Sequence, residues 1–170
     1  MRKIMLTILI AFAALVAILV AFFLVYGRAE TWRLVAGDPD LGQFDRSAPA
    51  RSEQPNDALF CTPGLCEGVP VDRELPEYAM PPGELIERIV AAMDEIAPVA
   101  ERVDDGGDPA QARFVTYTEA LRFPDTNSFE AVPLGDGRTG LVAYARAQLG
   151  KSDVGNNRKR LEAIVSRIDR

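Results

Sequence analysis

The 170-residue sequence contains no histidine and only two cysteines, and these shortages exclude several kinds of site. Without imidazole there is no Ser-His-Asp or Cys-His nucleophile system and no histidine ligand for zinc. Two thiols are too few for a four-cysteine zinc site. The 25 acids outnumber the 19 bases, which speaks against nucleic acid as a partner. We therefore predict neither a metal site nor any other cofactor.

Charge is also missing from one long stretch near the amino terminus. From Ile4 to Tyr26 there are 23 residues without a charged side chain, nearly all of them Ile, Leu, Val, Ala or Phe. As a helix this stretch is about 34 Å long, against about 30 Å for the hydrocarbon core of a bilayer. The alternative is a cleaved signal peptide, but its apolar region is normally about 7–15 residues long and ends in a small-x-small site. The length favours a transmembrane anchor.

The anchor predicts where the rest of the chain lies. Because Arg2 and Lys3 precede the apolar stretch, the positive-inside rule places the amino terminus in the cytoplasm. We expect residues 1–27 to cross the inner (cytoplasmic) membrane once, with the lipid bilayer as partner. The carboxy-terminal part would then lie in the periplasm or outside the cell. Residues 28–57 are rich in turn formers and show no lasting apolar period, so we expect an extended lead-in there.

Residues 58–170 are expected to form one exported α+β domain. The pair Pro81-Pro82 marks a helix start, and apolar residues recur at helical spacing from Leu85 to Met93. Segments rich in β-branched and aromatic residues predict four strands, at residues 99–103, 112–123, 129–134 and 141–146. Between the second and third strands we expect a structural turn that includes Arg122 and Asp125. With a last helix over residues 157–168, this order predicts an antiparallel sheet of about four strands covered by two helices.

The two cysteines flank a turn sequence, Cys61-Thr62-Pro63-Gly64-Leu65-Cys66. Proline suits the second position of a tight turn and glycine the third, where φ is positive. Such a turn brings the two sulfur atoms to bridging distance, and export favours oxidation, so we expect a structural disulfide. A pair of buried thiols and a redox site are the alternatives. The spacing differs from the two-residue spacing of thioredoxin-like motifs.

Charge is unevenly distributed along the exported part. From Arg138 to the carboxy terminus there are eight bases and three acids, whereas residues 27–137 hold nine bases and 22 acids. Two explanations remain open. Either the two regions neutralise each other within one domain, or the basic region binds an anionic ligand.

Several short motifs resemble one bacterial family, catalogued as domain of unknown function 1499. They are Pro55-Asn56-Asp57, the cysteine turn, Arg122-Phe123-Pro124-Asp125 and, above all, Gly150-Lys151-Ser152-Asp153-Val154-Gly155-Asn156-Asn157-Arg158-Lys159-Arg160. The resemblance covers about residues 37–168. The preceding strand departs from the family, because Ala145-Arg146-Ala147-Gln148 stands where Ser-Arg-Ser-Arg is usual. The resemblance implies an architecture and a setting, but no reaction.

The last motif has a physical interpretation of its own. Ser152 or Asp153 stands where a side-chain oxygen accepts hydrogen bonds from the free N–H groups at the start of the last helix. Asn157 lies four residues before Leu161 and so falls on the inward stripe, where a buried amide needs partners. We expect Asn157 to tie the turn before the helix to neighbouring backbone.

The bases of this motif leave a choice between structure and ligand binding. Arg158, Lys159 and Arg160 would occupy the first helical turn, where the helix dipole disfavours positive charge. They therefore need an acidic partner, such as Asp125, or an anionic ligand. In the second case, helix-start amides together with Arg146, Arg158 and Arg160 would form the site.

The sequence thus predicts a single-pass, membrane-anchored envelope protein with a non-catalytic binding or scaffolding domain. Its partner would be another envelope protein or an anionic glycan or lipid. The first alternative is an anionic-ligand module that uses the basic start of the last helix. The second is a hydrolase that uses paired carboxylates, which needs two inward acids within about 10 Å of each other.

Overall fold

Four helices and six strands follow one another along residues 2–168, which a computed structural model of the chain describes. The helices are α1 (Arg2–Tyr26), α2 (Arg28–Ala36), α3 (Pro82–Ile96) and α4 (Asn156–Ile168). The strands are β1 (Asp57–Cys61), β2 (Arg73–Glu74), β3 (Glu101–Arg102), β4 (Gln111–Tyr117), β5 (Pro124–Gly135) and β6 (Arg138–Ala147). The α+β class is as predicted.

The strands form one mixed sheet in the order β2-β1-β6-β5-β4-β3. Only the pairing of β1 with β2 is parallel, and the other neighbours are antiparallel. The expected four-stranded antiparallel sheet is therefore too small. Strand β1 was missed because Ala58, Leu59 and Phe60 are all buried, so the segment shows no alternation of apolar and polar residues.

Strand β5 corrects another expectation. Residues 124–127 were expected to be a turn, yet β5 begins at Pro124 and pairs with β4 and β6 from its first residues. Polar residues here are buried: Asp125, Thr126 and Asn127 are each at most 2% exposed. Because their side chains find partners inside the fold, a turn-like sequence is accommodated in a central strand.

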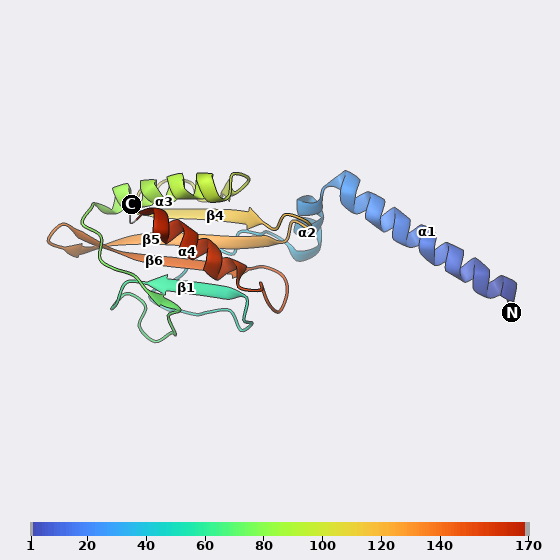
Figure 1. The fold of residues 1–170 in the computed structure, drawn as a ribbon, viewed down its shortest axis with the longest axis horizontal. Coiled ribbons are helices and arrows are strands. Elements are labelled where there is room, and N and C mark those ends of the chain that lie inside the picture. Colours follow the sequence, from blue (N-terminus) through green and yellow to red (C-terminus); the bar gives the residue numbers. More distant parts are fainter. Residues whose placement is uncertain (1, 169–170) are drawn as a thin grey trace.

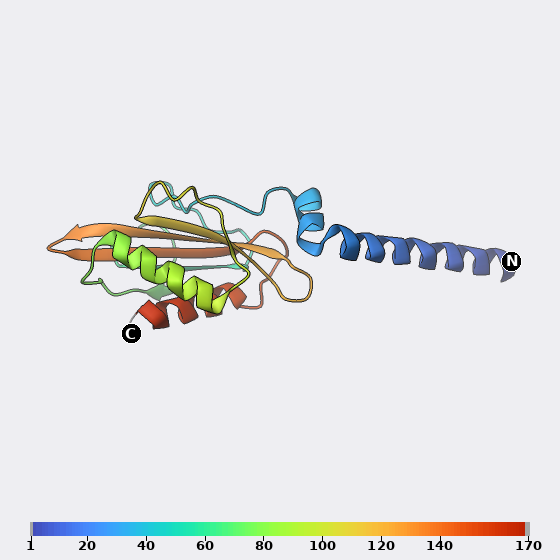
Figure 2. The same ribbon diagram turned by 90° about the horizontal axis from the view of Figure 1, so that it is seen from above.

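Helices α3 and α4 lie on one face of the sheet (Figures 1 and 2). Each presents an apolar stripe at helical spacing, and Leu85, Ile89 and Met93 of α3 are completely buried. Leu161 and Ile164 of α4 are buried as well and belong to the same cluster. Both helices begin within a residue of the predicted starts, since proline and the apolar period mark them clearly.

The opposite face of the sheet is covered by the irregular segment 37–56. Phe44 from this segment packs on Tyr144, with their ring centroids 4.8 Å apart, and both join Leu59 and Val142 in a second apolar cluster. The segment is extended, as expected of residues 28–57, but residues 28–36 form helix α2 instead. The segment belongs to the folded domain because it buries one sheet face.

Helix α1 projects away from the domain (Figure 2). It is 25 residues long, an 18-residue window of it has a mean hydropathy of 3.3, and its side chains are not buried. The helix is long and apolar enough to cross a membrane. A signal sequence meets the same two criteria. Gly27 joins α1 to α2 at φ 111°, a backbone conformation that residues with a side chain rarely adopt.

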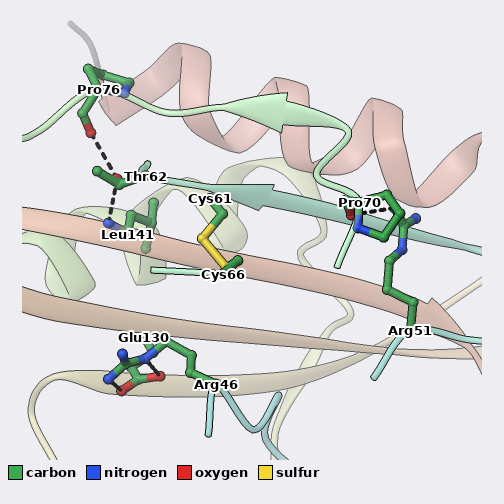
Figure 3. The surroundings of a disulfide bond; sticks show 9 residues. All are labelled: Arg46, Arg51, Cys61, Thr62, Cys66, Pro70, Pro76, Glu130 and Leu141. Carbon is green, nitrogen blue, oxygen red and sulfur yellow. Dashed lines mark hydrogen bonds and ion pairs between the residues drawn. A yellow bond between two sulfur atoms is a disulfide. The ribbon is translucent and has the colours of Figure 1, made fainter. Parts of the chain in front are cut away.

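The cysteine turn contains the expected disulfide between Cys61 and Cys66, with Cα atoms 6.3 Å apart (Figure 3). Gly64 has φ 84°, as its place in the turn requires. The neighbouring Thr62 is buried. Its hydroxyl accepts a hydrogen bond from the Leu141 amide at 2.9 Å and donates one to the Pro76 carbonyl at 3.1 Å. The bridge thus closes a turn that is already fixed to β6.

Candidate functional site

Four polar side chains meet beneath the first turn of α4, and we call them the Arg160 cluster: Asp125 and Asn127 of β5, and Asn157 and Arg160 of α4. The Arg160 guanidinium donates to the Asp125 carboxylate at 2.9 Å, to the Asn127 side-chain oxygen at 3.0 Å and to the Asn157 side-chain oxygen at 2.7 Å. Asp125, Asn127 and Asn157 are at most 2% exposed. A buried charge is thus paired and hydrogen-bonded.

Asn157 joins the cluster to the start of β1. Its side-chain N–H donates to the Asn56 carbonyl at 3.0 Å, as the predicted tie to neighbouring backbone requires. The side chain of Asn56 in turn donates to the Gly150 carbonyl at 2.7 Å, at the beginning of the long motif. Sequence reasoning gave no role to Asn56 or Asn127, because both stand among polar or turn-forming residues that do not mark them as buried.

Asp153 caps α4. Its carboxylate accepts hydrogen bonds from the Asn157 amide at 2.7 Å and from the Gly155 amide at 3.0 Å. The Ser152 hydroxyl accepts only from the exposed Val154 amide, at 3.2 Å, just before the helix. Of the two candidate caps, Asp153 therefore satisfies the free helix-start amide and places a negative charge at the positive end of the helix dipole.

The Asp125 carboxyl is the electrostatically unusual group of the cluster. Burial raises the pKa of Asp125 above its ordinary value, even though the nearby Arg160 guanidinium acts in the opposite direction. The Asp153 carboxylate raises that pKa further. Both acids have structural partners, since Asp125 is bound by Arg160 and Asp153 by backbone amides.

The remaining bases of the motif are exposed and differ in their contacts. Arg158 donates to Glu162 at 3.1 Å and lies over the Phe60 ring at 6.0 Å. Lys159 makes no ion pair with any of residues 2–168. Lys159 is therefore a cation that the described part of the domain does not neutralise.

The expected grouping of Arg146 with Arg158 and Arg160 does not form. Along β6, Arg146 shares a sheet face with Val142 and Tyr144, which is the face covered by segment 37–56. Its guanidinium donates to the Leu41 carbonyl in that segment. Helix α4 covers the other face, so the sheet separates Arg146 from the two bases of α4.

Arg122 and Asp125 do not share a turn either. Arg122 lies in the 118–123 turn, where its φ of 58° is unusual for a residue with a side chain. Its guanidinium lies 4.6 Å from the centre of the Tyr117 ring, a cation–π contact. The turn thus precedes β5, whereas Asp125 is already part of the strand.

A cleft of about 680 Å³ opens beside the Arg160 cluster. It lies between the end of α3 and the start of α4, with the end of β4 also contributing to its wall. The residues that line it include Ile96, Val99, Thr116, Lys159, Arg160 and Ala163. One wall is therefore apolar and another carries a cation that is not paired within the described chain.

A second polar network lies at the edge of the other face. Arg51 is 2.7 Å from Asp57 and 2.8 Å from Asp72, and the Tyr144 hydroxyl donates to Asp57 at 2.8 Å. Burial acts to raise the pKa of Asp57, but hydrogen bonds from Arg51, Tyr144 and the Ser52 amide lower it below its usual range. Sequence reasoning missed this network, because its members are far apart in the chain.

Neither polar network resembles a metal centre. Among residues 2–168 there is no group of three or more acidic or cysteine side chains that could hold a metal ion. Both networks join chain segments that are distant in sequence, and their donors and acceptors are largely occupied by one another. The hollow that lies next to the Arg160 cluster is the cleft with Lys159.

A family model described as a protein of unknown function (DUF1499) matches residues 47–168. The match spans β1 to α4 and therefore includes the Arg160 cluster, the disulfide and the Arg51–Asp57 network. No curated protein and no solved structure matches the chain. Since the matched residues make up well over half of the sequence, the chain belongs to the DUF1499 family.

Proposed function

We propose that this chain is a single-pass membrane protein whose family domain is held outside the cytoplasm as a non-catalytic binding or scaffolding module. The observation that carries the proposal is a series of aromatic contacts that leads from α1 through α2 to the domain. Phe23 of α1 contacts Trp32 of α2 edge to face at 5.6 Å, and Trp32 packs on Phe123 at 4.8 Å. The Trp32 indole N–H also donates to the Leu121 carbonyl at 2.7 Å.

These contacts favour retention of α1. A signal peptide is removed during export and has no reason to pack on the mature domain, whereas an anchor does. The aromatic rings of Phe23 and Trp32 would lie near the level of the lipid headgroups, where such rings are favoured. The bases Arg2 and Lys3 support a cytoplasmic amino terminus, and the Cys61–Cys66 disulfide supports an oxidising compartment for the domain.

The state of the candidate site supports a role in binding. Asp125 and Asp153, the acids of the Arg160 cluster and of the helix cap, are engaged by Arg160 and by backbone amides, and the acid that lines the cleft itself is the exposed Glu119. A nucleophile or general base must be directed at a substrate in the cleft, whereas these two carboxylates are directed at Arg160 and at the start of α4, and neither lines the cleft. The cleft beside them offers a hollow with apolar side chains, the bases Lys159 and Arg160 and the acid Glu119.

Membrane fractionation with mass analysis tests the anchor. We expect a full-length chain of 18.6 kDa that stays in the membrane after alkaline carbonate washing. The two cysteines should resist alkylation in intact cells until a reductant is added. A shorter mature chain that lacks α1, or free thiols in the untreated cell, would overturn the proposal.

Anion binding at the cleft is a second candidate, favoured by the unneutralised Lys159 beside Arg160. The test compares Lys159→Glu with Lys151→Glu in the full chain in neutral detergent, with glycerol 3-phosphate and a sulfated oligosaccharide as probes. Lys151 is an exposed lysine of the same motif that does not line the cleft, so it serves as the matched control. Loss of binding in the Lys159 variant alone supports this function. Equal binding by both variants, or no binding by the unmodified chain, contradicts it.

A further inference from the structure

Large apolar side chains are exposed at one end of the domain. Outside α1, the described residues include six such side chains: Leu34, Val35, Val99, Leu121, Leu134 and Val154. Four of them form what we call the end patch: Leu34 and Val35 of α2, Leu121 of the 118–123 turn and Val154 of the 150–155 loop. Their exposed fractions are 65%, 70%, 47% and 80%, respectively.

Hydrogen bonds hold the three segments of the end patch together. Trp32 of α2 donates to the Leu121 carbonyl, and Arg28 donates to the Ala120 carbonyl. Gln148, just after β6, donates to the Asp38 carbonyl at 2.7 Å and so joins the chain after α2 to the beginning of the 150–155 loop. All of these segments lie at the end of the sheet from which α1 leaves (Figure 1).

Val154 is the member of the end patch whose apolar side chain contributes least to the fold. It is 80% exposed and has φ 56°, a left-handed conformation that is a genuine outlier for a β-branched residue. It therefore supports neither the core nor the local backbone. Together with the other members of the end patch, Val154 adds to an exposed apolar surface of the kind that contacts membranes or partners.

The position of α1 identifies that partner. Phe22 and Tyr26 stack at 5.0 Å in the last turns of α1, and Trp32 follows in α2. These rings mark the level at which a spanning helix leaves the hydrocarbon core. Because the Trp32 indole N–H is hydrogen-bonded to the Leu121 carbonyl, the 118–123 turn lies at the same level as these rings relative to the membrane.

We propose that the end patch rests on the bilayer surface beside α1, with Leu34, Val35, Leu121 and Val154 inserted at the boundary between headgroups and acyl chains. This inference rests on the proposed membrane anchor. Charges around the patch are mixed, since Arg28, Arg122 and Lys151 are accompanied by Glu30 and Glu119. Apolar insertion is therefore the main attraction, and a zwitterionic membrane suffices.

Site-directed labelling of the full chain in phosphatidylcholine nanodiscs tests the inference. The described residues contain no free cysteine, so a single introduced cysteine carries the polarity-sensitive fluorophore. The test positions are Val154→Cys and Leu121→Cys. Leu134→Cys is the matched control, because Leu134 is an exposed leucine near the β5–β6 hairpin at the opposite end of the sheet (Figure 1).

We expect nitroxide lipids with shallow labels to quench the fluorophores at positions 121 and 154 but not the one at position 134. Equal quenching at 154 and 134 would overturn the inference. A label at Leu15→Cys in α1 tests the anchor separately, since deeply placed nitroxides should quench it wherever the domain lies. If the position-15 label is not quenched, the proposed anchor itself fails.

A second variant tests the cause of the contact. Val154→Asp combined with Leu121→Asp should reduce quenching of a label at Leu34→Cys, because charge disfavours insertion. Leu134→Asp, as the control, should leave that quenching unchanged. Unchanged quenching in the double variant would show that the end patch does not hold the domain to the membrane.

Discussion

The Arg160 guanidinium on α4 lies 2.9 Å from the Asp125 carboxylate on β5, and both side chains are largely removed from water, at 14% and 3% exposure. This ion pair joins the last helix of the chain to a central strand of the sheet. It also explains how a basic first turn is tolerated at the positive end of a helix dipole, because Asp125 supplies the opposing charge.

Replacing Arg160 by methionine should therefore destabilise the domain by about 3–5 kcal/mol, since it leaves Asp125 buried without its partner. The free energy of unfolding is measured by urea titration of the full chain in neutral detergent, followed by near-ultraviolet circular dichroism. Arg158→Met is the control. That arginine is exposed, and its contacts with Glu162, the Asp72 carbonyl and the Phe60 ring lie at the surface or are long, so the change should cost no more than about 1 kcal/mol.

The double variant Arg160→Met with Asp125→Asn separates loss of the pair from loss of packing. Removing both charges should recover part of the stability that Arg160→Met loses, because no ionised group is then left buried. If the double variant is less stable than Arg160→Met alone, the buried charge is not the cause of the loss.

Asn157 provides a test of the tie between α4 and β1. Asn157→Ala should lower the free energy of unfolding by about 1–3 kcal/mol, because the Asn56 carbonyl and Arg160 each lose a buried partner. The neighbouring Asn156 is exposed and serves as the matched control. Asn156→Ala should be nearly neutral, and equal losses at the two positions would contradict the assigned role.

Much of the architecture was predictable because local patterns are strong. The starts of α3 and α4, the cysteine turn and the course of β6 follow from proline, glycine and apolar period. Strand β1 was not predictable in this way, since burial on both faces removes the alternation that marks a strand. The beginning of β5 was missed because Pro124-Asp125-Thr126-Asn127 has the composition of a turn. Helix α2 was missed because it is short and its partner, the 118–123 turn, is about 90 residues away in sequence.

The candidate site was predictable only in part, for a related reason. Asp153 binds backbone amides of its own motif, so spacing alone indicated its role, and the helical period indicated that Asn157 is buried. The partners Asn56 and Asn127 come from distant strands, and their involvement depends on sheet register. The separation of Arg146 from Arg160 likewise depends on strand register. Arg146 points to the face of β6 opposite α4, and a shift of one residue in register would have turned its side chain toward α4.

Acid should weaken the domain through Asp57. Its pKa is lowered in the folded state by Arg51, Tyr144 and the Ser52 amide against the effect of burial, so the unfolded chain binds the proton more tightly. The stabilisation is complete above the unfolded pKa of about 3.9 and is lost as the pH falls through the lower folded value. Asp125 has the opposite shift, so its contribution to stability declines as the pH rises through its raised pKa.

Asp57→Asn should thus lower stability at neutral pH and flatten the fall in unfolding free energy between about pH 5 and pH 2. Urea titrations at a series of pH values measure both effects. Asp105→Asn is the control, because Asp105 is exposed in the turn before β4. A variant at position 57 that keeps the full acid dependence would show that another group is responsible.

The disulfide should stabilise the domain only modestly, because the loop it closes is short. Cys61 and Cys66 are five residues apart, and the chain-entropy relation gives about 2 kcal/mol for a loop of this size. The surrounding turn is fixed independently, since Thr62 is hydrogen-bonded to Leu141 and Pro76. Cys61→Ala with Cys66→Ala should therefore still fold, with a thermal midpoint lower by about 5–10 °C. A reductant should lower the midpoint of the unmodified chain by a similar amount and leave the double variant unaffected. If the reductant acts equally on both, the bridge does not account for the stability it is assigned.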